Sequence, residues 1–155
     1  NLAVMRTLED VIAVLEKAAK ARIRLRPEFK PLLTVSGIGQ ILGLTIMLET
    51  GDIGRFAKVG NYASYCRCVG SEYLSNHKRK GRGNTKNGNK YLAWAYLEAA
   101  NFAVRYNPQI KRYYQRKRAR TNGIVAIKTV AHKLARACYY ILRDQVPFDV
   151  NKAFV

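Results

Sequence analysis

The apolar residues of this chain recur at intervals of three and four, and no segment sustains the two-residue alternation of a half-buried strand. Residues 2–25 show this pattern most clearly, because polar residues fill the positions between the apolar ones up to the stop at Pro27. We therefore predict a mainly α-helical fold. Residues 1–27 are predicted as an amphipathic, coiled-coil-like helix, which either pairs with its copy in another subunit or packs as an ordinary helix.

The length of 155 residues fits one compact helical domain with an additional arm. We predict this domain over residues 28–150 and a short tail over residues 151–155. Asn107 and Pro108 separate two helices of the domain, since proline disrupts a helix interior but favours its first turn. Further helices are expected over residues 40–48, 58–69, 89–106, 108–120 and 124–143.

Residues 71–90 combine two serines, six basic residues and three glycines with a single acid, Glu72. Glycines let the backbone approach a ligand closely, and clustered cations attract phosphate. We therefore predict a long basic, glycine-rich loop that contacts the phosphates of a nucleic acid. The predicted contact residues are His77, Lys78, Arg79, Lys80, Arg82, Lys86 and Lys90.

The whole chain is strongly basic, with 28 Lys and Arg against 10 Asp and Glu and a formal net charge of +18. Glu98 is the only acid between Tyr73 and Arg143, a segment that holds 17 of the 28 basic residues. This charge predicts a polyanionic partner, DNA, and binding that weakens steeply with salt. An anionic membrane is the alternative, but no run of 18 apolar residues predicts a membrane span. We expect a cytoplasmic, nucleoid-associated protein.

The predicted helix at residues 108–120 concentrates six cations without an acid. Like charges on one helix repel each other unless an anion screens them, which favours nucleic-acid binding over a solvated surface. The predicted contacts are Lys111, Arg112, Arg116, Lys117, Arg118 and Arg120. Tyr113 and Tyr114 lie among these cations, where a tyrosine either stacks on bases, packs in the core or acts as the nucleophile of a tyrosine recombinase.

Gly37 and Gly39 lie in a short turn between two predicted helices. A helix, a GIG turn and a second helix resemble a helix-hairpin-helix element. The turn of such an element presents backbone N–H groups to a DNA phosphate, beside the positive end of the second helix. We predict phosphate contact at both glycines, and a tight turn between two helices is the alternative.

The three cysteines, Cys66, Cys68 and Cys138, do not have the spacing of a zinc site, and the chain has only two histidines. They are predicted as buried thiols in a reducing cytoplasm. We expect no metal site and no cofactor in this part of the protein.

Several motifs occur in an order that is more specific than any one of them. VSGIGQILG, GDIGRF, SEYLSN and TKNGNKYLAWAYLEAAN follow one another between residues 35 and 101. Over residues 32–147 the chain resembles the C-terminal transposase domain of the IS116/IS110/IS902 insertion-sequence transposases, the Piv-like recombinases of the DEDD type. The resemblance implies a recombinase that uses a structured RNA to choose its DNA sites, and we expect this recombinase to be a homo-oligomer.

The resemblance also implies a second domain, N-terminal to this one and joined to it by a coiled coil. That domain is RuvC-like and carries four acidic residues that bind a divalent metal, Mg. The chain starts at Asn1 rather than Met, so we expect a fragment that lacks this metal-binding domain.

The resemblance further implies a serine that attacks the DNA backbone. Ser75 matches this serine best, and Ser71 is the next candidate. Asn76 follows Ser75 where the family has glycine, and Arg67 and Gly70 occupy positions of glycine and proline. We therefore expect a DNA transposase domain that binds DNA and RNA, supplies Ser75 for strand cleavage and is inactive without the metal-binding domain. The alternative is a noncatalytic helix-hairpin-helix module that binds DNA or RNA.

Overall fold

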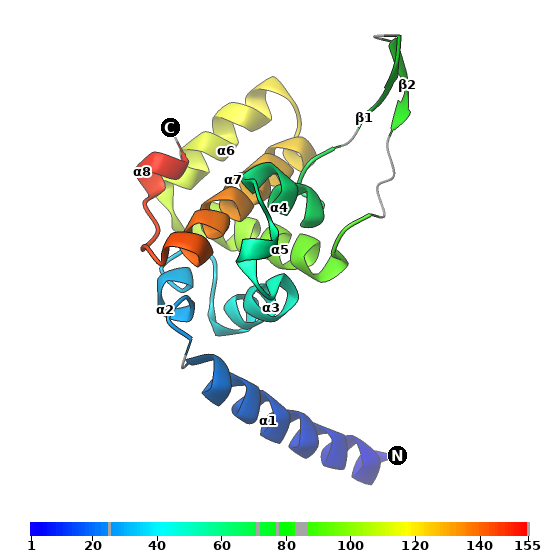
Figure 1. The fold of residues 1–155 in the computed structure, drawn as a ribbon. Coiled ribbons are helices and arrows are strands. Elements are labelled where there is room, and N and C mark those ends of the chain that lie inside the picture. Colours follow the sequence, from blue (N-terminus) through cyan, green and yellow to red (C-terminus); the bar gives the residue numbers. More distant parts are fainter. Residues whose placement is uncertain (25, 71, 77, 83–86, 155) are drawn as a thin grey trace.

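The computed structural model describes residues 1–24, 26–70, 72–76, 78–82 and 87–154 and is mainly α-helical, which confirms the predicted fold class (Figure 1). In chain order its elements are α1 (Leu2–Arg24), α2 (Phe29–Leu32), α3 (Gln40–Thr50), η1 (Ile53–Arg55), α4 (Val59–Tyr65), β1 (Glu72–Ser75), β2 (Lys78–Arg82), α5 (Lys90–Tyr106), α6 (Pro108–Arg120), α7 (Gly123–Asp144) and α8 (Val150–Ala153). The helices other than α1 surround one core, and α1 and the two strands extend from it in different directions (Figure 1).

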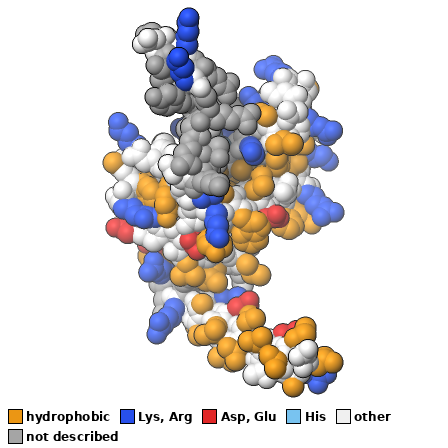
Figure 2. Space-filling view, turned by 90° about the vertical axis from the view of Figure 1, so that its right-hand side faces the viewer, with side chains coloured by type: hydrophobic (Ala, Val, Ile, Leu, Met, Phe, Trp, Pro, Cys, Tyr) orange, Lys and Arg blue, Asp and Glu red, His pale blue; other side chains and the backbone are white. Residues whose placement is uncertain are grey.

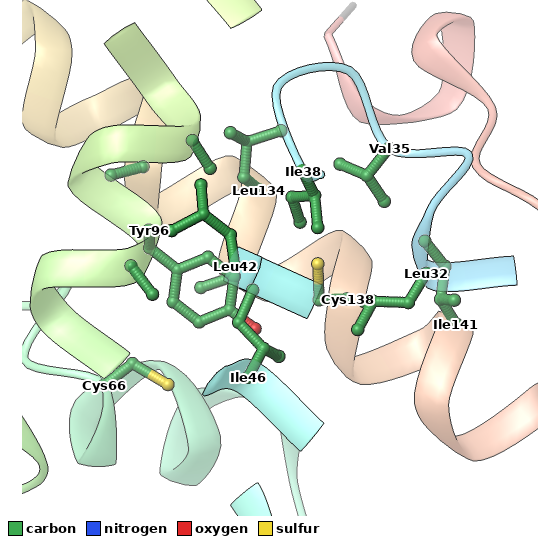
Figure 3. Packing of buried hydrophobic residues seen from close by; sticks show 14 of the residues in the cluster. Leu32, Val35, Ile38, Leu42, Ile46, Cys66, Tyr96, Leu134, Cys138 and Ile141 are labelled. Atoms are coloured by element: carbon green, nitrogen blue, oxygen red, sulfur yellow. The ribbon is translucent and has the colours of Figure 1, made fainter. Parts of the chain in front are cut away.

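The long helices α5 and α7 pack against each other at the centre, with α3 and α6 against α5 and α4 against α7. Small side chains allow this close approach, since Ala95, Ala99, Ala100 and Ala103 of α5 are fully buried. Larger apolar residues from several helices fill the space between the backbones. Figure 3 shows part of this cluster, including Leu32, Leu42, Ile46, Tyr96, Leu134 and Cys138.

Asparagines mark the start of the three longest helices of the domain. The side-chain oxygens of Asn89, Asn107 and Asn122 accept hydrogen bonds from backbone N–H groups in the first turns of α5, α6 and α7. A short acceptor at this position satisfies N–H groups that have no partner within the helix. Pro108 follows Asn107 at the first position of α6. These caps explain why the three helices begin within one residue of the predicted starts.

A chain of hydroxyl groups crosses the apolar core. The Tyr62 hydroxyl lies 2.9 Å from the Thr50 hydroxyl and 2.7 Å from the Tyr96 hydroxyl. Tyr62 and Tyr96 are fully buried, and burial raises the pKa of both phenols well above its usual value. Hydrogen bonds among the three hydroxyls offset the cost of removing them from water.

Removing the central hydroxyl is expected to destabilise the fold more than removing the terminal one. Tyr62→Phe deprives both Thr50 and Tyr96 of a partner, whereas Tyr96→Phe leaves the bond between Thr50 and Tyr62 in place. We expect a loss of about 2 kcal/mol for Tyr62→Phe and about 1 kcal/mol for Tyr96→Phe. Urea unfolding measures both, with Tyr106→Phe as the exposed control. Equal losses for the two buried variants would contradict the network.

Helix α1 extends beyond the helical domain as a single helix (Figure 1). Its large apolar side chains are exposed, for example Leu8 at 56%, Ile12 at 54% and Leu15 at 63%. The helix covers most of the segment for which an amphipathic helix was predicted. Its pairing with a second copy stays a prediction.

Residues 72–82 contain a short antiparallel hairpin where the sequence predicts a loop. Strands β1 and β2 pair Glu72 with Arg82, Tyr73 with Gly81, Leu74 with Arg79 and Ser75 with Lys78, with an irregularity between Tyr73 and Leu74. The hairpin projects from the helical domain (Figure 1). Because it packs on no sheet, its strands need no apolar face, and the alternation that identifies a strand in a sequence is absent.

Candidate nucleic-acid interface

Helix α5 begins at a cluster of polar contacts with α3 and α4. We use the name hairpin arm for residues 72–76 and 78–82. The amide nitrogen of the Asn89 side chain donates to Glu49 Oε2 at 2.6 Å and to the Tyr65 hydroxyl at 3.4 Å, while its oxygen caps α5. The backbone N–H of Asn89 donates to the Tyr65 carbonyl at 2.7 Å. Asn89 therefore joins the ends of α3 and α4 to the start of α5.

Gly88 and Arg67 strengthen this attachment. Gly88 has φ of +94°, and a Cβ atom at this position would overlap the Tyr65 carbonyl. The Arg67 guanidinium donates from Nε and Nη2 to the Gly88 carbonyl, at 3.1 and 2.9 Å. The chain thus returns from the hairpin arm at a fixed place on the domain.

Two residues that depart from the family pattern have a backbone conformation that suits glycine. Asn76 has φ of +49° and Arg67 has φ of +55°. Glycine adopts this left-handed region without cost, and asparagine tolerates it better than most other residues. The backbone at both places therefore matches the glycines that the resemblance implies, although the side chains differ.

The backbone of Ser75 lies at the end of β1 and pairs with that of Lys78, the first residue of β2. Lys78 and Lys80 are exposed, and Figure 2 shows Lys or Arg side chains at the tip. Arg79 and Arg82 belong to the same strand, β2. Ser71, His77 and Lys86 lie outside the described residues. The catalytic and phosphate-binding roles of this set stay predictions.

Helix α6 carries the six basic residues that are predicted to contact nucleic acid, and its first turn contains no acid. Lys111, Arg112, Arg116, Arg118 and Arg120 are exposed and Lys117 is half-buried. Their unscreened charge gives α6 the electrostatic character of a surface that binds polyanions. Lys90 lies at the start of α5, with Nζ 4.9 Å from the centre of the Tyr91 ring.

Tyr113 on α6 packs against the C-terminal segment. Its ring meets that of Phe154 edge to face at 5.4 Å, and Lys133 Nζ lies 5.0 Å from its centre. Partial burial raises the pKa of Tyr113. These contacts favour the packing interpretation of Tyr113 over a nucleophile, since a phenol is activated by losing its proton.

The GIG turn packs against α5 through its first glycine. Gly37 has φ of +89°, and a Cβ atom there would overlap the Ala99 carbonyl and lie 2.7 Å from the Ala103 nitrogen. Gly39 is exposed, caps α3 and has open space around it. Gly37 therefore has a packing reason to be glycine, and Gly39 leaves the first N–H groups of α3 accessible. Phosphate contact at either glycine stays a prediction.

Helix α5 exposes an aromatic face that the sequence interpretation missed. Tyr91, Trp94, Phe102 and Tyr106 are between 42% and 70% exposed. Their positions recur at helical spacing, a signal that was masked by the many other apolar residues of α5. Figure 2 shows hydrophobic side chains beneath the hairpin arm with Lys and Arg around them. Exposed aromatic rings beside cations are typical of surfaces that bind bases or other proteins.

All three cysteines are free, with Cys66 and Cys138 buried and Cys68 half-buried. Burial raises the pKa of Cys68 and of Cys138 to about 12, so both remain protonated at neutral pH. Within the described residues, no group of three or more His, Cys, Asp and Glu side chains is arranged to hold a metal ion. None of the described helices has the length and apolar character that crossing a membrane requires.

Comparison with known proteins places the site in a family. No curated protein sequence matches this chain. The family described as Transposase IS116/IS110/IS902 family matches residues 29–115, which is more than half of the chain. The matched region runs from α2 into α6 and includes the GIG turn, the hairpin arm and the Asn89 cluster. The chain therefore belongs to the Transposase IS116/IS110/IS902 family.

Proposed function

We propose that this chain is the domain of a DNA transposase that binds DNA and supplies Ser75 as the nucleophile for strand cleavage. The proposal is supported by the backbone conformation of the hairpin arm, which lies within the region matched to the family. Ser75 ends β1, and the next residue, Asn76, has the left-handed conformation expected where the family has glycine. The assignment of Ser75 in preference to Ser71 is supported by this agreement.

The proposed reaction is a transfer at phosphorus. The Ser75 oxygen attacks a backbone phosphate, an ester bond between phosphorus and one deoxyribose oxygen breaks, and the serine proton passes to a base, for which His77 is the nearest candidate in the sequence. Negative charge develops on the nonbridging oxygens, and Lys78, Lys80 and their basic neighbours stabilise it. A divalent metal held by acids of another domain would add charge stabilisation for the leaving oxygen.

The basic surface of α6 is suited to hold and position a long nucleic acid. Exposed cations on α6 would hold phosphates of DNA, and a structured RNA is the second polyanion that the family resemblance implies. The exposed apolar residues of α1 support pairing with a second copy in a homo-oligomer. A noncatalytic nucleic-acid-binding module is the alternative, favoured by the exposed start of α3 at Gly39.

Charge removal at the tip of the hairpin arm tests the interface. Lys78→Ala/Lys80→Ala is expected to weaken binding of a duplex DNA and to reduce the slope of log K against log salt by up to about 1.8, because each lost phosphate contact removes about 0.9. Fluorescence anisotropy over a salt series measures the slope. Lys17→Ala/Lys30→Ala removes the same charge from α1 and α2 and should leave the slope nearly unchanged. Equal slopes for the two double variants would refute contact through the arm.

A further inference from the structure

A groove of about 900 Å³ lies between α7, α6 and the C-terminal segment 146–153, which we call the tail groove. One stripe of α7 forms its floor, because the lining residues of this helix recur at three- and four-residue spacing. Val146, Pro147 and Phe148 form the facing apolar wall. The residues of α7 and α6 that matter below are His132, Lys133, Arg136, Tyr140 and Tyr113.

The wall of the tail groove is held in place at several points. The backbone N–H of Phe148 donates to the Thr34 hydroxyl at 2.8 Å, and Lys133 Nζ donates to the Ala153 carbonyl at 2.8 Å. The Gln109 side chain donates to Asn151 Oδ1 at 2.9 Å. These bonds join the C-terminal segment to the loop after α2, to α7 and to α6, so the groove exists before any ligand binds.

The tail groove is lined by more cationic than acidic side chains. Lys133, Arg136 and Lys152 line it together with His132. Its two acids are engaged elsewhere: Arg143 donates to both oxygens of Asp144, and Asp149 caps α8.

Within the described part of the chain, Arg136 and Lys152 form no ion pair. Burial and the charges of Arg136 and Lys133 lower the pKa of His132, which reflects these cationic surroundings. An anion would therefore find donors on His132, Arg136 and Lys152, beside two carboxylates that already accept hydrogen bonds.

Flat apolar surfaces accompany these cations. Tyr140 is 40% exposed and is supported edge to face by the buried Tyr139, with ring centres 5.3 Å apart. Together with Phe148 and Pro147 it gives the groove surfaces on which a base can stack. The combination of a concave apolar wall with a few charged groups is typical of small-ligand sites of this volume.

We propose that the tail groove binds one nucleotide unit of a single-stranded nucleic acid, with its base against Tyr140 and the 146–148 wall and its phosphate at His132 and Arg136. Lys152 and Ala153 of α8 line the tail groove, and α8 lies away from the hairpin arm (Figure 1). It is therefore a second nucleic-acid site, independent of Ser75 and of the strand-cleavage chemistry. A strand of DNA and a strand of RNA share the required chemistry.

Fluorescence anisotropy with labelled octamers of thymidine and of uridine tests this site and distinguishes the two sources. We expect Arg136→Gln to weaken binding of the preferred octamer about tenfold and Tyr140→Leu about fivefold or more. Lys128→Gln removes an exposed charge of α7 outside the groove and should change affinity less than about twofold. Circular dichroism checks that each variant is folded.

His132 provides a second measurement, because the chain has only two histidines and their NMR signals can be assigned by a His77→Gln variant. A bound phosphate raises the pKa of His132, so octamer affinity should increase as the pH falls from about 8 to about 6. The other titratable side chains that line the groove with His132 are Tyr113, Lys133, Arg136, Tyr140, Asp144, Asp149 and Lys152.

Tighter binding of the thymidine octamer identifies a DNA strand as the ligand, and tighter binding of the uridine octamer identifies RNA. Equal effects of Arg136→Gln and Lys128→Gln, or a His132 signal that neither octamer shifts, would overturn the proposal and leave the groove to another class of ligand, such as a peptide.

Discussion

Ser75→Ala, placed in a protein that joins this chain to the metal-binding domain implied by the resemblance, is expected to reduce DNA strand cleavage by at least about 10³-fold, because no other atom replaces the attacking oxygen. Nucleic-acid affinity stays within about twofold of the wild-type value, since the serine hydroxyl contributes little beside the many cations of the surface. Denaturing gels measure the nicked product, and fluorescence anisotropy measures binding by the same preparation. The separation of the two readouts distinguishes a nucleophile from a residue that merely supports binding.

The matched control is Ser71→Ala, which removes the other serine of the same stretch. Cleavage that survives Ser71→Ala and is lost in Ser75→Ala supports the proposed assignment. The reverse result would transfer the role to Ser71. Full cleavage by both variants would leave the noncatalytic binding module as the better account of this domain.

Gly37→Ala destabilises the domain by about 4 kcal/mol, the largest effect on stability that we expect from a single methyl group here. Two costs combine. The φ of +89° is unfavourable for alanine, and the new Cβ atom meets the backbone of α5 at Ala99 and Ala103, which cannot move aside as a flexible side chain would. For a chain of this size the melting temperature should fall by about 10 °C.

Gly60→Ala is the matched control, because Gly60 lies in α4 with open space around it and no positive φ. Alanine is a better helix former than glycine, so this variant should be as stable as the wild type or slightly more stable. Thermal and urea unfolding measure both variants. A Gly37→Ala protein as stable as Gly60→Ala would show that the GIG turn does not pack closely on α5.

Local signals in the sequence were sufficient for much of the fold. Asn89, Asn107 with Pro108, and Asn122 are capping residues whose effect is contained within one helical turn, so the starts of α5, α6 and α7 are predictable. The hairpin arm is different, because a projecting ribbon lacks the apolar alternation by which strands are recognised.

Features that depend on contacts between segments distant in the sequence could not be predicted from local sequence patterns. The GIG turn was predicted to contact phosphate, with a tight turn between two helices as the alternative, and nothing near Gly37 in the sequence indicates that α5 packs against it. The tail groove requires the bond between Phe148 and Thr34, which are separated by 114 positions. On α5, the buried and exposed faces are both apolar, so composition did not show which residues remain in solvent.

The residue that becomes covalently linked to DNA tests the central claim most directly. The full-length protein is incubated with a nicked DNA that traps the intermediate, digested with nuclease and protease, and analysed by mass spectrometry. We predict a phosphate-linked adduct on Ser75. An adduct on Tyr113 or Tyr114, or continued cleavage without any serine adduct, would contradict the serine mechanism.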